Sequence, residues 1–144
     1  MFETSEAAEA AFYAAFARGR LDEMMQVWAP AADIVCIHPG GPRLCGVDEV
    51  RLSWRHILAD STPRAFDLRG LQVLDGGDQR IHLLEENIRV PGTTFAAPPV
   101  LATNVYRRAS EGWRMVLHHA SVSPAALVAP RPAPSGAAPP RRLH

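Results

Sequence analysis

The stretch Gly112–Val122, GWRMVLHHASV, decides the fold of this chain. It is rich in aromatic and β-branched residues, follows a Glu-Gly turn signal and ends before Ser-Pro, a pattern that predicts a β-strand. Side chains alternate between the two faces of a strand, so the two adjacent histidines are expected to point in opposite directions. One face is then expected to carry Trp113, Met115, Leu117, His119 and Ser121, and the other Arg114, Val116, His118 and Ala120.

Three further strands precede this stretch along the chain. Val100–Arg108 is expected to pair with it across the turn ASEG, and Ala65–Leu74 is expected to pair with Gln79–Val90 across the tight-turn signal DGGD. The segment PGTTFAAPP between these two pairs is typical of a loop. The second half of the chain therefore predicts consecutive antiparallel strands.

The first half has helical periodicity instead. Ser5–Arg18, Leu21–Trp28 and Gly46–Ala59 carry apolar residues at helical spacing and acidic residues in their first turns, and Ser5 is a suitable N-cap. Between the second and third helices, Asp33–His38 predicts a short strand that ends at the turn PGGP. Helices followed by strands indicate an α+β fold, in which three N-terminal helices pack on a curved, mostly antiparallel sheet.

Length and composition fit one domain over residues 1–123. The 144 residues carry a formal net charge of zero, which gives no general attraction to nucleic acid or to an anionic membrane. No apolar run reaches the roughly 20 residues that span a bilayer, and the acidic N-terminus is unlike a secretory signal. We therefore expect a cytoplasmic protein in which Cys36 and Cys45 are free thiols.

The composition changes at residue 124. Residues 124–144 hold six of the 13 prolines, many alanines and no aromatic residue. Such a segment buries too little apolar surface to offset its ordering entropy, so an extended or disordered tail is expected. A dispensable tail and a docking arm are both compatible with this composition.

Three motifs, in this order, resemble the SnoaL-like branch of the nuclear transport factor 2-like superfamily. They are FARGRLDEMMQVWAPAADIVCIHPGG at 16–41, GVDEVRLSW at 46–54 and EGWRMVLHHAS at 111–121. The resemblance covers most of residues 5–123. It implies a cone-shaped α+β barrel with an apolar pocket between helices and sheet, and a homodimer formed through the outer sheet face. It also implies that the strand face of Leu117, His119 and Ser121 is the concave, inner face. It does not specify one function, because this fold hosts enzymes and binding proteins.

The steroid isomerases of this superfamily use a tyrosine in the first helix, a carboxylate base after the first strand and a protonated aspartate on a late strand. Matching the block around Gly19 places Phe12 at the tyrosine position, with Tyr13 one residue away. The base position falls on His38 and the late acid on Asn104. The resemblance thus implies a histidine as the base and an amide as the oxyanion donor.

The candidate site residues follow from these patterns. Acid–base or oxyanion roles are assigned to His38, His119 and Asn104, although each could instead be a hydrogen-bonded structural residue. A second set is expected to line the pocket, although the tryptophans could instead belong to the core. This ligand-binding set is Phe12, Tyr13, Trp28, Trp54, Tyr106, Leu117 and Ser121.

Other kinds of site have little support in the sequence. No CxxC or HxxxH spacing suggests a metal centre, no GxSxG elbow suggests a nucleophile, and no P-loop is present, so neither a metal nor a cofactor is expected. The chain has no lysine, which excludes a Schiff base.

Three functions remain open at this stage. The first is a homodimeric protein that binds a small, mostly apolar molecule in one enclosed pocket. The second is a cofactor-free isomerase, dehydratase or cyclase with a histidine as general acid or base. The third is a non-catalytic dimeric scaffold.

Overall fold

The computed structural model describes residues 1–94 and 96–124 of the chain. Helices α1 (Ser5–Arg18), α2 (Leu21–Val27) and α3 (Gly46–Leu58) all lie in the first half, as the periodicity predicts. Most of the predicted tail, from residue 125 onward, lies outside the described residues. The strands are β1 (Val35–Ile37), β2 (Leu44–Cys45), β3 (Ala65–Asp75), β4 (Gln79–Arg89), β5 (Val100–Ala109) and β6 (Gly112–Val122).

Local sequence signals fix both ends of α1. The hydroxyl of Thr4 accepts a hydrogen bond from the backbone N–H of Ala7 at 3.0 Å, so Thr4 is the N-cap and the prediction of Ser5 is wrong by one residue. Ser5 is instead the first residue of the helix and is fully buried. Gly19 ends the helix with φ 66, a left-handed conformation that glycine adopts without steric cost.

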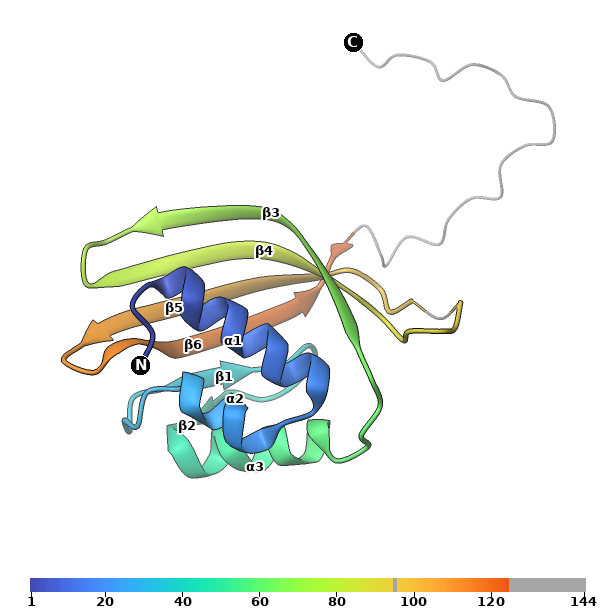
Figure 1. Ribbon diagram of the computed structural model, residues 1–144, viewed down its shortest axis with the longest axis horizontal. Helices are drawn as coiled ribbons and strands as arrows, with labels where there is room; N and C mark the ends of the chain where they lie inside the picture. The colour runs from blue at the N-terminus through green and yellow to red at the C-terminus, as the bar shows by residue number, and fades with distance from the viewer. Residues whose placement is uncertain (95, 125–144) are drawn as a thin grey trace, which may run out of the picture.

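The six strands form one sheet in the order β2-β1-β6-β5-β4-β3. The long strands β3 to β6 pair antiparallel with their neighbours, and β1 joins the far side of β6 in parallel. Figure 1 shows α1 crossing the sheet while α2 and α3 lie beside β1 and β2. The predicted α+β fold is confirmed, with β2 as an additional short strand that the sequence analysis missed.

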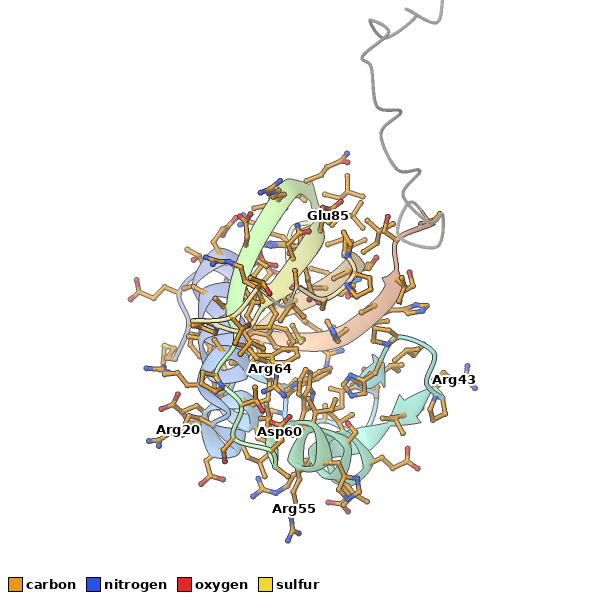
Figure 2. The ribbon with its side chains drawn as sticks, turned by 90° about the vertical axis from the view of Figure 1, so that its right-hand side faces the viewer. Arg20, Arg43, Arg55, Asp60, Arg64 and Glu85 are labelled. Carbon is orange, nitrogen blue, oxygen red and sulfur yellow. The ribbon has the colours of Figure 1, made fainter. Side chains whose placement is uncertain are left out.

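The sheet has an inner face toward the helices and an outer face away from them. Inner-face side chains include His82, Leu84 and Glu86 of β4 and Ala102, Asn104 and Tyr106 of β5, all of them buried. Outer-face side chains include Leu83 and Glu85 of β4 and Leu101, Thr103 and Val105 of β5. Figure 2 shows the strands curving above the helices, with Arg55 of α3 and Glu85 of β4 at opposite ends of the view.

A β-bulge interrupts the alternation of side chains along β6. Val105 pairs with Leu117 and the next residue, Tyr106, pairs with Met115, so Val116 is an extra residue on β6. Met115 and Val116 are consequently both buried. Beyond Val116, each β6 side chain lies on the face opposite to the one that regular alternation would give it. His118 therefore lies on the inner face and His119 on the outer face, the reverse of the predicted arrangement.

The space between α1, α3 and the inner face is filled mainly by aromatic side chains. Phe12 and Trp54 are completely buried, and their ring centroids lie 5.4 Å apart in an edge-to-face arrangement. Phe16 contacts Trp54 from the same helix as Phe12, with centroids 4.9 Å apart. Such edge-to-face pairs add to the stabilisation that burial of the rings provides. Within the described residues, no helix is long and apolar enough to cross a membrane.

Candidate functional site

A chain of buried polar side chains runs across the inner face. Tyr13 of α1 donates its hydroxyl proton to Oε2 of Glu86 on β4 over 2.6 Å. The amide Nδ2 of Asn104 on β5 donates to the hydroxyl of Tyr13 over 3.0 Å, and Nδ1 of His118 on β6 lies 2.6 Å from Oδ1 of Asn104. We call these four residues the inner-face chain. Residues from one helix and three strands meet here because β4, β5 and β6 are adjacent in the sheet.

Glu86 supplies the carboxyl group of the inner-face chain. Burial disfavours its charged form and raises its pKa to about 7, although the hydrogen bond from Tyr13 acts in the opposite direction. The same burial, together with the neighbouring Glu86 charge, raises the pKa of Tyr13, which therefore remains a donor. Glu86 is thus a carboxyl group that can gain or lose a proton near neutral pH.

The pKa of the buried His118 is shifted in the opposite direction to that of Glu86. Burial lowers its pKa to about 3, and the nearby His38 and His119 act in the same direction, so the ring is neutral at pH 7. In a neutral imidazole that donates Nδ1–H to Asn104, Nε2 carries a lone pair. Within the described residues, Nε2 of His118 and Oε1 of Glu86 have no hydrogen-bond partner. They are the two free polar atoms of the inner-face chain.

His38 lies at the edge of this arrangement, directly after β1. Its ring centroid is 4.9 Å from that of Trp54 and 6.3 Å from that of His118. Ser53 donates its hydroxyl proton to the carbonyl of Val50, so Nε2 of His38 carries the proton that is shared with Ser53 over 3.1 Å. Partial burial lowers the pKa of His38, and its Nδ1 is left as a neutral acceptor.

A second buried cluster adjoins the inner-face chain at α1. Oε2 of Glu9 lies 3.0 Å from Nδ1 of His82 and 3.2 Å from the hydroxyl of Tyr106. The other nitrogen of His82 contacts the hydroxyl of Ser5 at 2.9 Å. Because Glu9 Oε2 also lies 3.5 Å from Nδ2 of Asn104, the two clusters form one continuous network.

The structure brings together several of the predicted site residues. Asn104 and Tyr13 belong to the inner-face chain, and Phe12, Trp54 and His38 surround the His118 ring. The indole N–H of Trp54 is buried and has no acceptor among the described residues.

Two predicted pocket residues lie on the inner side but outside the inner-face chain. Tyr106 is completely buried and bonds Glu9. Trp28 is also buried and forms a bridge with Met115, but it makes no ring contact with His38 or His118 in the described part of the chain.

The predicted placement of three residues of β6 is wrong. Leu117, His119 and Ser121 were expected on the inner face, but they follow the Val116 bulge and lie on the outer face. His119 and Ser121 are exposed and Leu117 is partly exposed. His119 therefore cannot act as a base from within the cone, and His118 takes its position there.

Sequence reasoning missed Glu86, His82 and Glu9. His82, Leu84 and Glu86 do share one face of the strand. However, polar and apolar residues do not alternate regularly along this strand, so the sequence does not mark the glutamate as buried. Glu9 looked like an ordinary acidic residue near the start of a helix. The available signal for it was its spacing from Tyr13, four residues along the same helix face.

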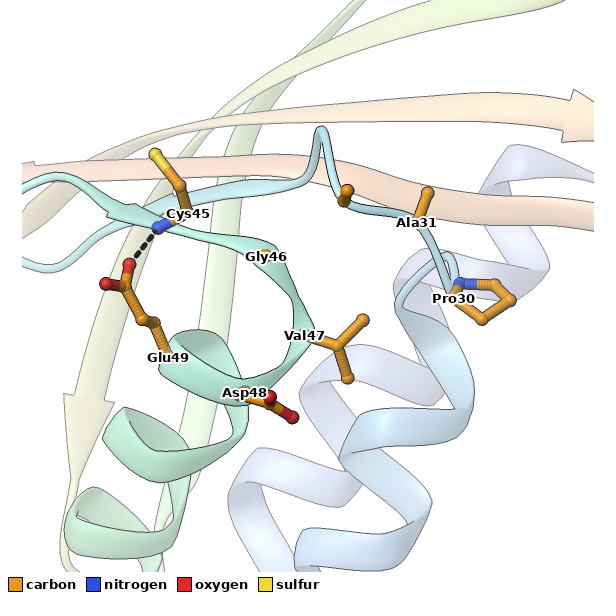
Figure 3. Close-up of a pocket in the computed structure, with 8 residues that line it drawn as sticks. Pro30, Ala31, Cys45, Gly46, Val47, Asp48 and Glu49 are labelled. Atoms are coloured by element: carbon orange, nitrogen blue, oxygen red, sulfur yellow. Dashed lines mark hydrogen bonds between the residues drawn. The ribbon is translucent and has the colours of Figure 1, made fainter.

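A separate hollow lies beside the start of α3, outside the predicted site. It measures about 500 Å³ and is lined mainly by small and apolar residues, among them Pro30, Ala31 and Val47 (Figure 3). Oε2 of Glu49, which lies in the first turns of α3, accepts the backbone N–H of the N-cap residue Cys45 there over 2.7 Å. In the described residues, no three side chains of His, Cys, Asp or Glu converge as a metal ion would require.

The fold and the buried polar site together define a SnoaL-like α+β protein, and the comparisons agree. The model of the SnoaL-like domain matches residues 6–126, so this chain belongs to the SnoaL-like family. A comparison with curated proteins found no significant match.

Solved structures show the same fold. A Thiobacillus denitrificans protein, named as an association domain of calcium/calmodulin-dependent protein kinase type II, is 41% identical, with a TM-score of 0.80 over 85% of this chain and 98% of its own. A Streptomyces avermitilis protein, named as a dehydratase of the NTF2-like family, is 34% identical, with a TM-score of 0.75 over 82% of this chain and 92% of its own. A Nostoc punctiforme protein with a cystatin-like fold, 14% identical, has a TM-score of 0.69 over 87% of this chain and 97% of its own.

Proposed function

We propose that this protein binds a small, mostly apolar molecule at the inner face and transfers a proton on it without a cofactor. The observation that carries the proposal is the Glu86 carboxyl, whose pKa is raised to about 7 and which is linked to a neutral His118 through Tyr13 and Asn104. Two titratable groups with pKa values moved in opposite directions are typical of acid–base sites.

The two free polar atoms suggest a division of roles. Nε2 of His118 would accept a proton from a carbon beside a carbonyl group, and Oε1 of protonated Glu86 would donate one to the leaving or carbonyl oxygen. The rings of Phe12, Trp54 and Phe16 would contact the apolar part of the molecule. His38, neutral and less buried, is the alternative base at the edge of the site.

A dehydration or an isomerisation fits these roles. In a dehydration, the base removes a proton from carbon while the acid protonates the departing hydroxyl, which leaves as water. In an isomerisation, the same two groups move a proton between two carbons through an enol. The relative from Streptomyces avermitilis, named as a dehydratase, supports the first reaction.

Proton transfer can be measured before the natural substrate is known. We expect the wild-type protein in D2O to introduce deuterium beside the carbonyl of neutral, apolar β-hydroxy ketones, or to dehydrate them, as read by mass spectrometry. Glu86→Gln should slow the reaction by about 100-fold, because the amide cannot donate a proton to oxygen. Glu85→Gln is the matched control, since Glu85 is the neighbouring residue on the outer face.

Two outcomes would contradict the enzyme proposal. One is equal rates for wild-type protein and Glu86→Gln. The other is a probe that binds at the inner face, shown by native mass spectrometry or line broadening, without any exchange; the protein would then be a binding protein, the first function that the sequence left open.

We also propose that the outer face pairs with a second copy of the chain. Leu101 is 43% exposed and Leu74 is 46% exposed on this face, and no helix among the described residues covers them. Large apolar side chains left exposed on an uncovered sheet face are compatible with an interaction surface. The relative from Thiobacillus denitrificans, named as an association domain, supports assembly as a second function.

Light scattering at micromolar concentration tests this pairing. The wild-type protein should have the mass of a dimer, and Leu101→Glu should have the mass of a monomer because an unpaired charge would be buried at the interface. Leu52→Glu is the matched control, since Leu52 is exposed on α3. A wild-type monomer, or a Leu101→Glu dimer of unchanged stability, would contradict the proposal.

A further inference from the structure

We infer that Glu9 is a positioning residue that sets the direction of hydrogen bonding along the inner-face chain and thereby selects which ring nitrogen of His118 is left bare. The inference rests on the proposed function only for the role of that nitrogen as a proton acceptor. Glu9 belongs to α1, is 7% exposed and reaches the chain through Asn104.

The Glu9 carboxyl is surrounded by polar groups. Its Oε2 lies within 3.5 Å of three polar groups, namely Nδ1 of His82, the hydroxyl of Tyr106 and Nδ2 of Asn104. A carboxylate oxygen can only accept hydrogen bonds. When Glu9 is ionised, every group that faces its Oε2 therefore presents a proton to it.

The amide of the Asn104 side chain has a donor end, Nδ2, and an acceptor end, Oδ1. If Nδ2 faces Glu9 and the Tyr13 hydroxyl, Oδ1 must face His118. The 2.6 Å contact between Oδ1 and Nδ1 then requires a proton on Nδ1, so a neutral His118 is bare at Nε2. The opposite amide orientation would set Oδ1 against the Glu9 carboxylate.

Glu86 does not fix this direction. Glu86 also draws a proton from Tyr13, but its pKa is about 7, so it is protonated in a large share of molecules at neutral pH. A protonated Glu86 could donate to Tyr13 instead of accepting from it. Glu9 would hold Asn104 in one orientation in both protonation states of Glu86, and His118 would keep its bare Nε2 throughout the reaction.

The test reads the His118 tautomer directly by 15N NMR of histidine-labelled protein, without any substrate. In the wild type, Nδ1 of His118 should carry the proton from pH 5.5 to pH 8.5. In Glu9→Gln, whose amide can donate as well as accept, the population of the Nε2–H tautomer should rise at least about tenfold. Glu6→Gln is the matched control, because Glu6 is an exposed residue of the same helix that contacts Ser5 and Arg80.

Two results would overturn the inference. The first is a folded Glu9→Gln protein, judged by circular dichroism, with the wild-type tautomer population. The second needs no variant: a wild-type tautomer that switches as Glu86 titrates near pH 7 would show that Glu86 sets the direction. Both readouts are independent of turnover, so failure of the enzyme proposal leaves this test unchanged.

Discussion

Replacing Trp54 by alanine is expected to lower the free energy of unfolding by about 3–5 kcal/mol. Trp54 is completely buried between α1, α3 and the inner face. Its ring contacts those of Phe16, His38 and Phe12 at centroid distances of 4.9, 4.9 and 5.4 Å. Alanine removes the transfer free energy of the indole and leaves a cavity that these rings can fill only in part.

Urea unfolding followed by far-ultraviolet circular dichroism measures this loss. Leu52→Ala is the matched control on the same helix, since Leu52 is 52% exposed and its truncation should change the free energy of unfolding by less than about 0.5 kcal/mol. If Trp54→Ala cost no more than Leu52→Ala, the aromatic cluster would not be the centre of the core.

Elements set by local signals could be predicted from the sequence. The predicted bounds of α1 and β6 agree with the structure, because Gly19 ends the helix and turn residues flank the strand. The predicted first strand was also found, but β2 was missed. That strand is only two residues long and exists through its pairing with β1, which no local pattern reveals.

The predicted faces of the β6 side chains were wrong where one residue of register decides the face. Alternation along β6 was counted without the extra residue Val116, and the apolar pair Met115-Val116 gives no sign of a bulge. A bulge depends on how the partner strand continues, so it is a property of the β5–β6 pair. Every assignment beyond it was inverted, which is why His119 was chosen instead of His118.

The buried network was unpredictable for a related reason. The sequence did indicate that Asn104, within an apolar strand, needs hydrogen-bond partners. Those partners lie far away in the chain: Tyr13 is separated from Asn104 by 91 residues and Glu9 by 95. Only the crossing of α1 over the sheet brings them together (Figure 1).

The stability of Glu86→Gln relative to the wild-type protein is expected to increase as the pH rises. The Glu86 carboxyl has its pKa raised from 4.5 to about 7 by burial, so between these values the folded state keeps a proton that the unfolded chain has lost. The free energy of unfolding therefore falls as the pH rises through this range, by on the order of 3 kcal/mol. Glutamine does not titrate, so the variant escapes this loss.

The titration of His118 changes the free energy of unfolding with pH in the opposite direction to that of Glu86. Its pKa is lowered from 6.5 to about 3, so stability is lost as the pH falls below 6.5 while the unfolded chain takes up the proton. Because both proteins contain His118, its contribution cancels in the difference between Glu86→Gln and wild type. That difference, measured by urea unfolding at pH 4.5, 6 and 8, should grow with pH by on the order of 3 kcal/mol, whereas Glu85→Gln should show no such growth. A constant difference would mean that Glu86 is ionised in the folded protein, and the neutral-pH proton donor proposed for the inner face would not exist.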